Sequence, residues 1–338
     1  CTSMNSATSA LHVACLSLGL KKNDIVWTTP NTFVASANCA LYCGAKIDFV
    51  DINSETNLID IQLLSKKLDK AEKANKLPKI IIPVHLTGQP TNQEDIYKLS
   101  KKYNFKIIED ASHSMGAIRN KEPVGTCKWS DITIFSFHPV KIITTGEGGM
   151  ILTNNVDVNH KAKLFRTSGI TREKSYFDNK NLGPWYYEQL VLGYNYKMTD
   201  IQAALGMSQL KRLDAFVNER NEIAKSYNDE LINLPIKLPF IMKENYSSFH
   251  LYVIRLEIDK IKITHKEVHQ KLIEKGISVN LHYFPVHLHP FYQKLGFKNG
   301  MFPESEKYAE QAISIPIFPG LSNIDQEYII KTLRKILI

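Results

Sequence analysis

The chain has 338 residues, of which 43% are hydrophobic and 22% are charged, as is typical of globular enzymes. Its net charge of +8 would suit nucleic acid, but the basic residues are scattered and form no stripe with interleaved aromatic residues. The five cysteines have no zinc-ligand spacing, and no apolar run approaches the ~20 residues of a membrane span. We therefore expect a cytoplasmic protein that binds neither nucleic acid, nor a metal, nor a membrane.

The chain begins with a polar run, Ser6-Ala7-Thr8, that leads into an apolar stretch with helical spacing from Ala10 to Gly19. The hydroxyl residues of this run could simply cap the helix. Alternatively, the free N–H groups at the start of the helix could bind a phosphate. The residues alone leave both interpretations open.

Strands and helices then alternate along the chain. Strands are predicted over 24–29, 47–50, 79–84 and 106–109, and helices over 32–44, 61–73 and 93–103. This order predicts a mainly parallel sheet covered by helices on both faces, with ligands at the carboxyl ends of the strands. Phe33 and Asp110 lie just beyond two of these strands. Phe33 could equally be a core residue and Asp110 a helix cap.

Lys141 lies in a nearly uncharged turn between two predicted strands, 131–137 and 148–153. Most lysines lie on solvated surfaces, and this one could too. Burial in such a turn, however, would lower the pKa of Lys141 and leave its amine free to attack a carbonyl. The three glycines after the turn suit a close approach of the backbone to a bound group.

The second half of the chain has a different pattern. The stretch 169–188 has no clear periodicity and is predicted to be a loop. Before this loop the sequence predicts a helix over 156–168. After the loop it predicts a long helix over 201–231, a strand over 250–256, a helix over 265–275 and a strand over 277–281. We expect a large domain over 1–213 and a smaller α+β domain over 214–338.

The segment around Lys141 resembles a motif of a known family. Ser-Phe-His-Pro-Val-Lys, closely followed by Thr-Thr-Gly-Glu-Gly-Gly, resembles the lysine motif of the DegT/DnrJ/EryC1/StrS sugar aminotransferases, and the resemblance extends over essentially the whole chain. It implies the α/β type I fold of pyridoxal-phosphate-dependent transferases. It also implies pyridoxal 5'-phosphate as cofactor, pyridoxamine phosphate as its intermediate form, and Lys141 as the catalytic residue.

The resemblance assigns the other cofactor contacts. Asp110, in Asp-Ala-Ser-His, would hold the pyridine nitrogen, and His113 would support a contact near the ring oxygen. Phe33 would stack on the ring. The phosphate would be held by Ser6, Ala7, Thr8 and Ser136, although Ser136 could also be a strand serine that faces solvent.

Two further motifs imply partners. Asn195, in Gly-Tyr-Asn-Tyr-Lys-Met-Thr-Asp, would reach the cofactor phosphate of a partner subunit, which implies a homodimer with shared active sites. The segment that would contact a nucleotide sugar consists of His282, Tyr283, Phe284 and Pro285. By the family pattern we also expect that an N-terminal segment is missing.

The residues before Lys141 most resemble the transaminases that make UDP-4-amino-4,6-dideoxy-N-acetyl-β-L-altrosamine for pseudaminic acid. They imply that L-glutamate donates an amino group to the C4 ketone of a UDP-linked 4-keto-6-deoxy-N-acetyl sugar. Alternatives are an aminotransferase of the perosamine or bacillosamine type and a non-catalytic regulator with the same fold. A deoxygenating dehydratase of the family is disfavoured, because those enzymes carry His in place of the lysine.

Overall fold

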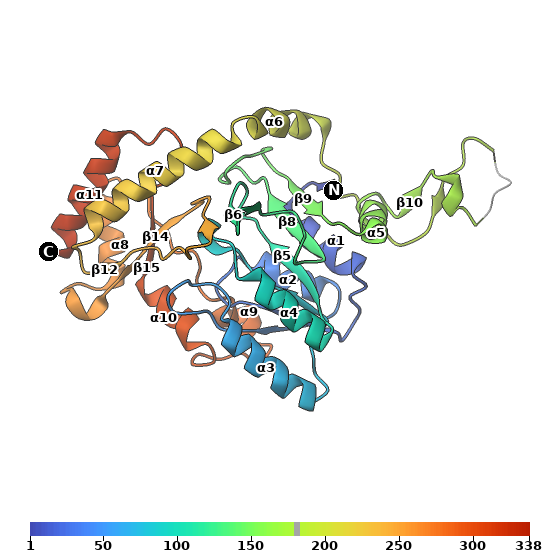
Figure 1. Ribbon diagram of the computed structural model, residues 1–338, viewed down its shortest axis with the longest axis horizontal. Helices are drawn as coiled ribbons and strands as arrows, with labels where there is room; N and C mark the ends of the chain where they lie inside the picture. The colour runs from blue at the N-terminus through green and yellow to red at the C-terminus, as the bar shows by residue number, and fades with distance from the viewer. Residues whose placement is uncertain (179–182) are drawn as a thin grey trace.

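The computed structural model describes residues 1–178 and 183–338 of the chain. Its central feature is a seven-stranded sheet with the order β1-β9-β8-β5-β4-β2-β3 (Figure 1). Strands β2, β3, β4, β5 and β8 pair in parallel, whereas β9 pairs antiparallel with β8 and β1. The seven strands are β1 (Thr2–Met4), β2 (Ile25–Thr28), β3 (Lys46–Phe49), β4 (Ile80–Ile82), β5 (Lys106–Asp110), β8 (Ile132–Ser136) and β9 (Gly149–Leu152). The mostly parallel sheet confirms the predicted fold class.

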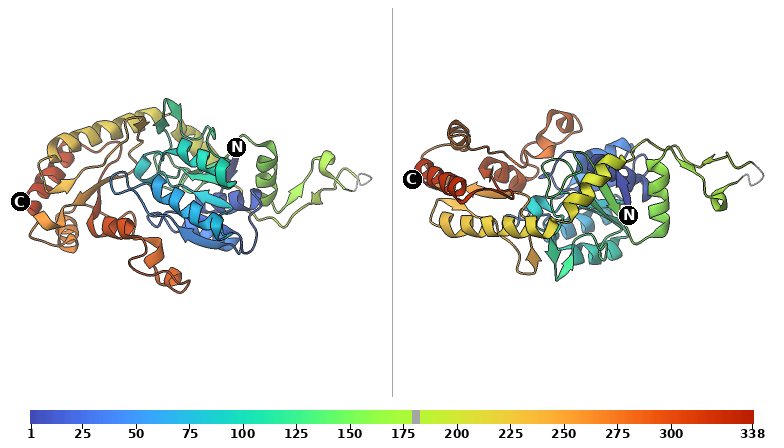
Figure 2. Two further views of the ribbon diagram at one scale, coloured as in Figure 1. Left: turned by 60° about the horizontal axis from the view of Figure 1, so that its bottom comes forward. Right: turned by 90° about the horizontal axis from the view of Figure 1, so that it is seen from above.

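Helices cover both faces of this sheet (Figures 1 and 2). Strand β4 shows why, because all three of its isoleucines are buried: Ile80 and Ile82 pack with the first set of helices, and Ile81 packs on the opposite face with the second set. The first set is α1 (Ala7–Ser17), α2 (Ala35–Tyr42) and α5 (Val156–Arg166), and the second is α3 (Ile61–Lys73) and α4 (Gln93–Tyr103).

The C-terminal part of the chain builds a smaller lobe around a three-stranded antiparallel sheet with the order β12-β14-β15. Its own core includes Tyr227, Tyr252 and Leu333, all fully buried. Helix α7 runs along both lobes in Figure 1. The elements of this lobe are α7 (Leu213–Leu231), β12 (Ile236–Lys237), β14 (Tyr252–Leu256), α8 (His265–Glu274), β15 (Ala312–Ile315) and α11 (Asn323–Leu337).

The chain returns to the large lobe before β15, because Val286, Tyr292 and Phe302 pack in the core of the central sheet. The domain division at 213 stays a prediction. No helix among the described residues has the length and apolar character of a bilayer span. The remaining elements are η1 (Leu86–Gly88), β6 (Ile118–Arg119), β7 (Glu122–Pro123), β10 (Ile170–Thr171), η2 (Lys174–Tyr176), β11 (Glu188–Gln189), α6 (Asp200–Leu210), β13 (Asn245–Tyr246), η3 (Ile258–Lys260), η4 (Val286–Leu288), α9 (Pro290–Gln293) and α10 (Pro303–Gln311).

Three predictions about elements differ from the structure. The long helix predicted over 201–231 is two helices, because Arg212 leaves helical geometry (φ −107°, ψ 4°) between α6 and α7. The strand predicted over 277–281 is absent: Asn280 alone forms an isolated bridge, with Ser314. The stretch 169–188 contains η2 and pairs its ends as β10 and β11, and its residues 179–182 lie outside the described chain.

Candidate active site

The carboxyl ends of four strands meet at one cavity of about 260 Å³. Strands β1, β2, β5 and β8 run in the same direction, so their carboxyl ends lie at the same edge of the sheet. Ser6 follows β1, Phe33 follows β2, Asp110 ends β5, and Ser136 ends β8 just before Lys141. All five residues line the cavity, although the chain separates them widely.

Lys141 is held in the turn after β8, where its N–H donates to the carbonyl of His138 at 2.9 Å. Its Nζ lies 3.5 Å from Nε2 of His250. Burial lowers the pKa of Lys141 to about 8, although the nearby Asp110 carboxylate acts in the opposite direction. A substantial fraction of this amine is therefore neutral near physiological pH, as a nucleophile or a general base requires.

Asp110 is 5% exposed, and both of its carboxylate oxygens accept hydrogen bonds. Ser36 Oγ donates to Oδ2 at 2.6 Å, and the N–H of Ser112 donates to Oδ1 at 3.1 Å. Hydrogen bonds to both oxygens favour the charged carboxylate at this buried position. Asp110 can therefore offer a fixed negative charge to a cation in the cavity.

His113 is buried beside the same cavity. Its Nδ1 accepts from the N–H of Thr87 at 3.3 Å, so Nε2 carries the proton and donates to Tyr283 Oη at 3.1 Å. Burial and the Lys141 charge hold the pKa of His113 well below its usual value. His250, whose ring centroid lies 4.5 Å from that of His113, has a lowered pKa for the same two reasons. Both imidazoles are therefore neutral.

The opposite end of the cavity is the N-terminus of α1. Ser6 caps this helix, since its Oγ accepts from the N–H of Ser9 at 3.1 Å, and the first turn contains no acidic residue. A Cβ atom at position 149 would lie 2.6 Å from the Ser6 carbonyl. Glycine is therefore needed here because the backbone at Ser6, just before α1, passes close to it. Ala7 and Thr8 also line the cavity, with first-turn N–H groups that have no intrahelical acceptor. Capping and phosphate binding are thus compatible here.

Three of the predicted site residues do not line this cavity. Asn195 is exposed, and its backbone bridges to Thr167. Phe284 is 47% exposed, and Pro285 is buried just before η4. By contrast, His282 and Tyr283 from the same segment do line the cavity.

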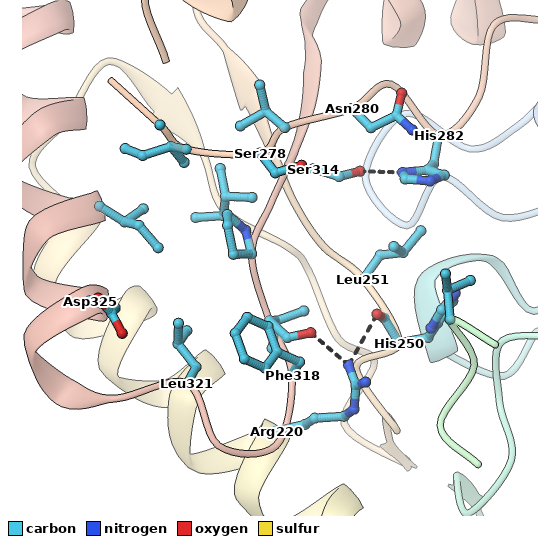
Figure 3. Close-up of a pocket in the computed structure, with 18 of the residues that line it drawn as sticks. Arg220, His250, Leu251, Ser278, Asn280, His282, Ser314, Phe318, Leu321 and Asp325 are labelled. Carbon is cyan, nitrogen blue, oxygen red and sulfur yellow. Dashed lines mark hydrogen bonds between the residues drawn. The ribbon is translucent and has the colours of Figure 1, made fainter. Parts of the chain in front are cut away.

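A second, larger cavity of about 770 Å³ is drawn in Figure 3. It adjoins the first cavity, because Lys141 and His282 line both. Arg220 lies on its wall at 4% exposure and donates from Nη1 to the carbonyls of Phe249, His250 and Ile317 at 2.9–3.2 Å. These bonds fix the backbone that carries His250.

The sequence analysis did not identify Ser36, His250 or Arg220. Ser36 lies in an alanine-rich helix, where a serine is inconspicuous. Arg220 lies more than seventy residues after Lys141 in the chain, and His250 lies 109 residues after it. The contact between His250 and Lys141 depends on the packing of the two lobes. The one local signal is that Ser36 and Asn38 are polar residues in the otherwise apolar segment Ala35–Ala40.

Comparison with known proteins decides the family. The model of the DegT/DnrJ/EryC1/StrS aminotransferase family matches residues 1–334. The chain belongs to this family.

Three relatives show the range within the family. An uncharacterised protein of Methanocaldococcus jannaschii is 40% identical, over 99% of this chain and 85% of its own length. The UDP-4-amino-4,6-dideoxy-N-acetyl-beta-L-altrosamine transaminase of Campylobacter jejuni is 37% identical, over 99% of this chain and 84% of its own length. GDP-perosamine synthase of Escherichia coli is 33% identical, over 99% of this chain and 85% of its own length.

Solved structures agree with these matches. A Helicobacter pylori aminotransferase involved in the biosynthesis of pseudoaminic acid has a TM-score of 0.88 at 29% identity, over 99% of this chain and 86% of its own. A sugar aminotransferase of Streptococcus pneumoniae in its PMP form has a TM-score of 0.87 at 28% identity, over 99% of this chain and 87% of its own. This chain is therefore a pyridoxal-phosphate-dependent sugar aminotransferase.

The residues around the smaller cavity fit this cofactor. They offer an amine of lowered pKa at Lys141, a carboxylate at Asp110, and a helix N-terminus without acidic residues for the phosphate. The exposed ring of Phe33 and the side chain of Val84 supply apolar surface in the same cavity. The donor set therefore matches the aldehyde, the ring nitrogen, the phosphate and the ring face of pyridoxal phosphate.

Proposed function

We propose that this enzyme transfers an amino group from L-glutamate to the C4 ketone of a UDP-linked 4-keto-6-deoxy-N-acetyl sugar. The product would be UDP-4-amino-4,6-dideoxy-N-acetyl-β-L-altrosamine. The observation that carries the chemistry is the buried Lys141 amine, with a pKa lowered to about 8, in one cavity with Asp110. The choice of sugar is supported by the 37% identity to the Campylobacter transaminase and by the residues before Lys141.

Four residues of the smaller cavity have roles around the cofactor ring in this proposal. The cofactor supplies an electron sink for the negative charge that develops at the donor Cα. Lys141 removes the proton from Cα as general base and returns a proton as general acid. Asp110 keeps the proton on the ring nitrogen, His113 supports the contact near the ring oxygen, and Phe33 packs on the ring.

The phosphate would be bound by backbone N–H groups and hydroxyls at the start of α1 and the end of β8. The helix N-terminus carries a partial positive charge that favours an anion. The residues in these positions are Ser6, Ala7, Thr8 and Ser136, all of which line the cavity.

We propose that the nucleotide sugar occupies the larger cavity, because Lys141 lines both cavities and can reach a ketone held between them. His282 and Tyr283 would contact the sugar directly. His282 is already oriented, since its Nδ1 lies 2.8 Å from Ser314 Oγ, and burial lowers its pKa to about 4. Phe284 and Pro285 would act at the rim, outside the smaller cavity.

We further propose that the active enzyme is a homodimer in which Asn195 serves the partner's cofactor phosphate. Helix α6, just after Asn195, has no buried residue, and its apolar side chains Ile201 and Met207 are 85% and 69% exposed. Such an apolar helix face is typical of a surface that a second subunit covers. The described part of the segment with β10 and β11 also projects from the body, in the same region of the chain (Figure 2).

The second candidate function is that of a perosamine-type aminotransferase, which the 33% identity to GDP-perosamine synthase favours. To test the proposal, the loaded enzyme would receive L-glutamate with the UDP-linked or a GDP-linked 4-keto-6-deoxy sugar. Mass spectrometry would then detect the amino sugar. An amino sugar from the UDP substrate supports the proposal, and one from the GDP substrate alone supports the perosamine type. Absence of cofactor binding would support the non-catalytic regulator.

A further inference from the structure

Two buried hydroxyl groups form a chain behind the Asp110 carboxylate. Thr32 Oγ1 lies 2.9 Å from Ser36 Oγ, and Ser36 Oγ lies 2.6 Å from Asp110 Oδ2. Thr32 and Ser36 are each 1% exposed. A hydroxyl group that is this deeply buried destabilises the folded state unless it is hydrogen-bonded. The fold therefore specifies this arrangement.

The direction of the hydrogen bonds follows from the carboxylate. An ionised carboxylate can only accept, so Ser36 donates its single proton to Asp110. Ser36 must then accept from Thr32, which donates in the remaining contact. The second oxygen of Asp110 accepts from the N–H of Ser112. Both carboxylate oxygens therefore have a fixed donor, and the carboxyl group cannot rotate without losing one of them.

The two donors come from different elements. Ser36 is the second residue of α2, whereas Ser112 lies in the turn after β5. Ser36 does not line the smaller cavity, although Asp110 does. Any effect of Ser36 on a ligand in the cavity must therefore pass through Asp110, through Thr32, which does line the cavity, or through the packing of α2.

We infer that Ser36, supported by Thr32, is a positioning residue that orients the Asp110 carboxylate toward the ring nitrogen of the cofactor. The inference rests on the proposed role of Asp110. The Ser36 hydroxyl holds the carboxylate in its charged, hydrogen-bonded orientation before the cofactor binds. Replacement by alanine frees one carboxylate oxygen and weakens the contact to the ring nitrogen, but it leaves the phosphate and Lys141 contacts in place.

The test compares two cofactors in the apo protein: pyridoxal 5'-phosphate and 1-deazapyridoxal 5'-phosphate, in which carbon replaces the ring nitrogen. Dissociation constants would be measured by equilibrium dialysis for the wild type, Ser36→Ala and Ser36→Thr. The control is Ser100→Ala, another buried helical serine, whose Oγ donates only to the carbonyl of Tyr97.

We expect Ser36→Ala to weaken binding of pyridoxal phosphate by about tenfold, the effect of one hydrogen bond to a charged group. Binding of the deaza cofactor should be unchanged, because that cofactor makes no bond to Asp110. Ser36→Thr keeps a hydroxyl group and should still bind pyridoxal phosphate more tightly than the deaza cofactor. Ser100→Ala should show the same preference. Equal weakening of both cofactors, or of neither, would overturn the inference.

The same measurement separates this inference from the proposed function. A wild-type protein that binds the two cofactors equally would refute the role of Asp110 and the inference together. A wild-type preference that Ser36→Ala leaves intact would refute the inference alone. Loss of that preference in Ser36→Ala alone supports both.

Discussion

The amine of Lys141 lies 3.5 Å from Nε2 of His250, in a site where His250 is buried and Lys141 is partly buried. Burial and the Lys141 charge keep the pKa of His250 well below its usual value, so this imidazole is neutral and can accept a hydrogen bond from the Lys141 amine at Nε2. The lysine thus has a neutral acceptor on one side and the Asp110 carboxylate nearby. This pairing leads to a prediction about pH.

The covalent attachment of pyridoxal phosphate should follow the titration of Lys141. Only the neutral amine attacks the aldehyde, and burial lowers the pKa of Lys141 to about 8 from its usual value of 10.5. The rate should rise with pH and level off above about 8. Stopped-flow absorbance of the apo protein mixed with cofactor, across the neutral and alkaline range, measures it. A rate still climbing steeply at pH 10 would show that the amine is not perturbed.

Replacement of Lys141 by alanine should abolish turnover. The variant loses both the covalent attachment and the general base, so borohydride reduction should leave no cofactor on the protein. Lys66→Ala, on the exposed side of α3, is the control and should retain both properties. Peptide mass spectrometry after reduction locates the attached cofactor. Wild-type turnover by Lys141→Ala would be incompatible with the proposed role.

Glu109→Gln should destabilise the fold by about 3–5 kcal/mol, because it removes the charge partner of Arg119 inside the protein. Glu109 is 1% exposed and also accepts from His85 Nε2 at 2.8 Å and from Ser130 Oγ at 2.6 Å. Denaturant unfolding measures the change. Glu94→Gln, on the exposed surface of α4, should change stability by less than about 0.5 kcal/mol.

The same glutamate should contribute to acid unfolding. Burial alone would raise the pKa of Glu109, but its hydrogen bond with His85 and the charges of His85 and Arg119 lower it to about 2 from its usual value of 4.5. Its stabilisation is therefore complete above pH 4.5 and is lost as the pH falls toward 2. Wild-type stability should fall more steeply than that of Glu109→Gln over this interval, and parallel curves would contradict the assignment.

If Asn195 serves the partner's site, two inactive variants should complement each other. A hybrid of a Lys141→Ala subunit with an Asn195→Ala subunit has one site with both residues intact. Unfolding and refolding the variants together should restore part of the activity that each lacks alone. If Asn195 acts in its own subunit, no hybrid site is complete, and the mixture should stay inactive.

Much of the large lobe could be predicted from the sequence. Helices over 61–73 and 93–103 were predicted at their observed bounds, because their apolar residues recur at helical spacing against one face of the sheet. Asp110 was identified as a residue at a strand end and Lys141 as a lysine in a nearly uncharged turn, and their roles followed from the resemblance to the family.

The rest depended on contacts between distant segments. The strand predicted over 277–281 has β-branched residues, yet only Asn280 pairs with another segment, at Ser314. Residues 277–280 instead line the wall of the larger cavity. The break at Arg212 has no glycine or proline to indicate it. The importance of Ser36 depends on its hydrogen bond to Asp110, which lies 74 positions away in the chain, and no local pattern indicates that contact.

The most direct test of the central claim is a single half-reaction. The loaded enzyme, converted by L-glutamate to its amino form, would receive the UDP-linked 4-keto sugar of L-arabino configuration and, separately, its D-xylo epimer. We predict that the visible absorbance band of the pyridoxal phosphate form returns with the L-sugar alone. We also predict that mass spectrometry detects the amino sugar in that sample. Return of the band with the D-sugar alone, or with neither sugar, would contradict the proposed substrate.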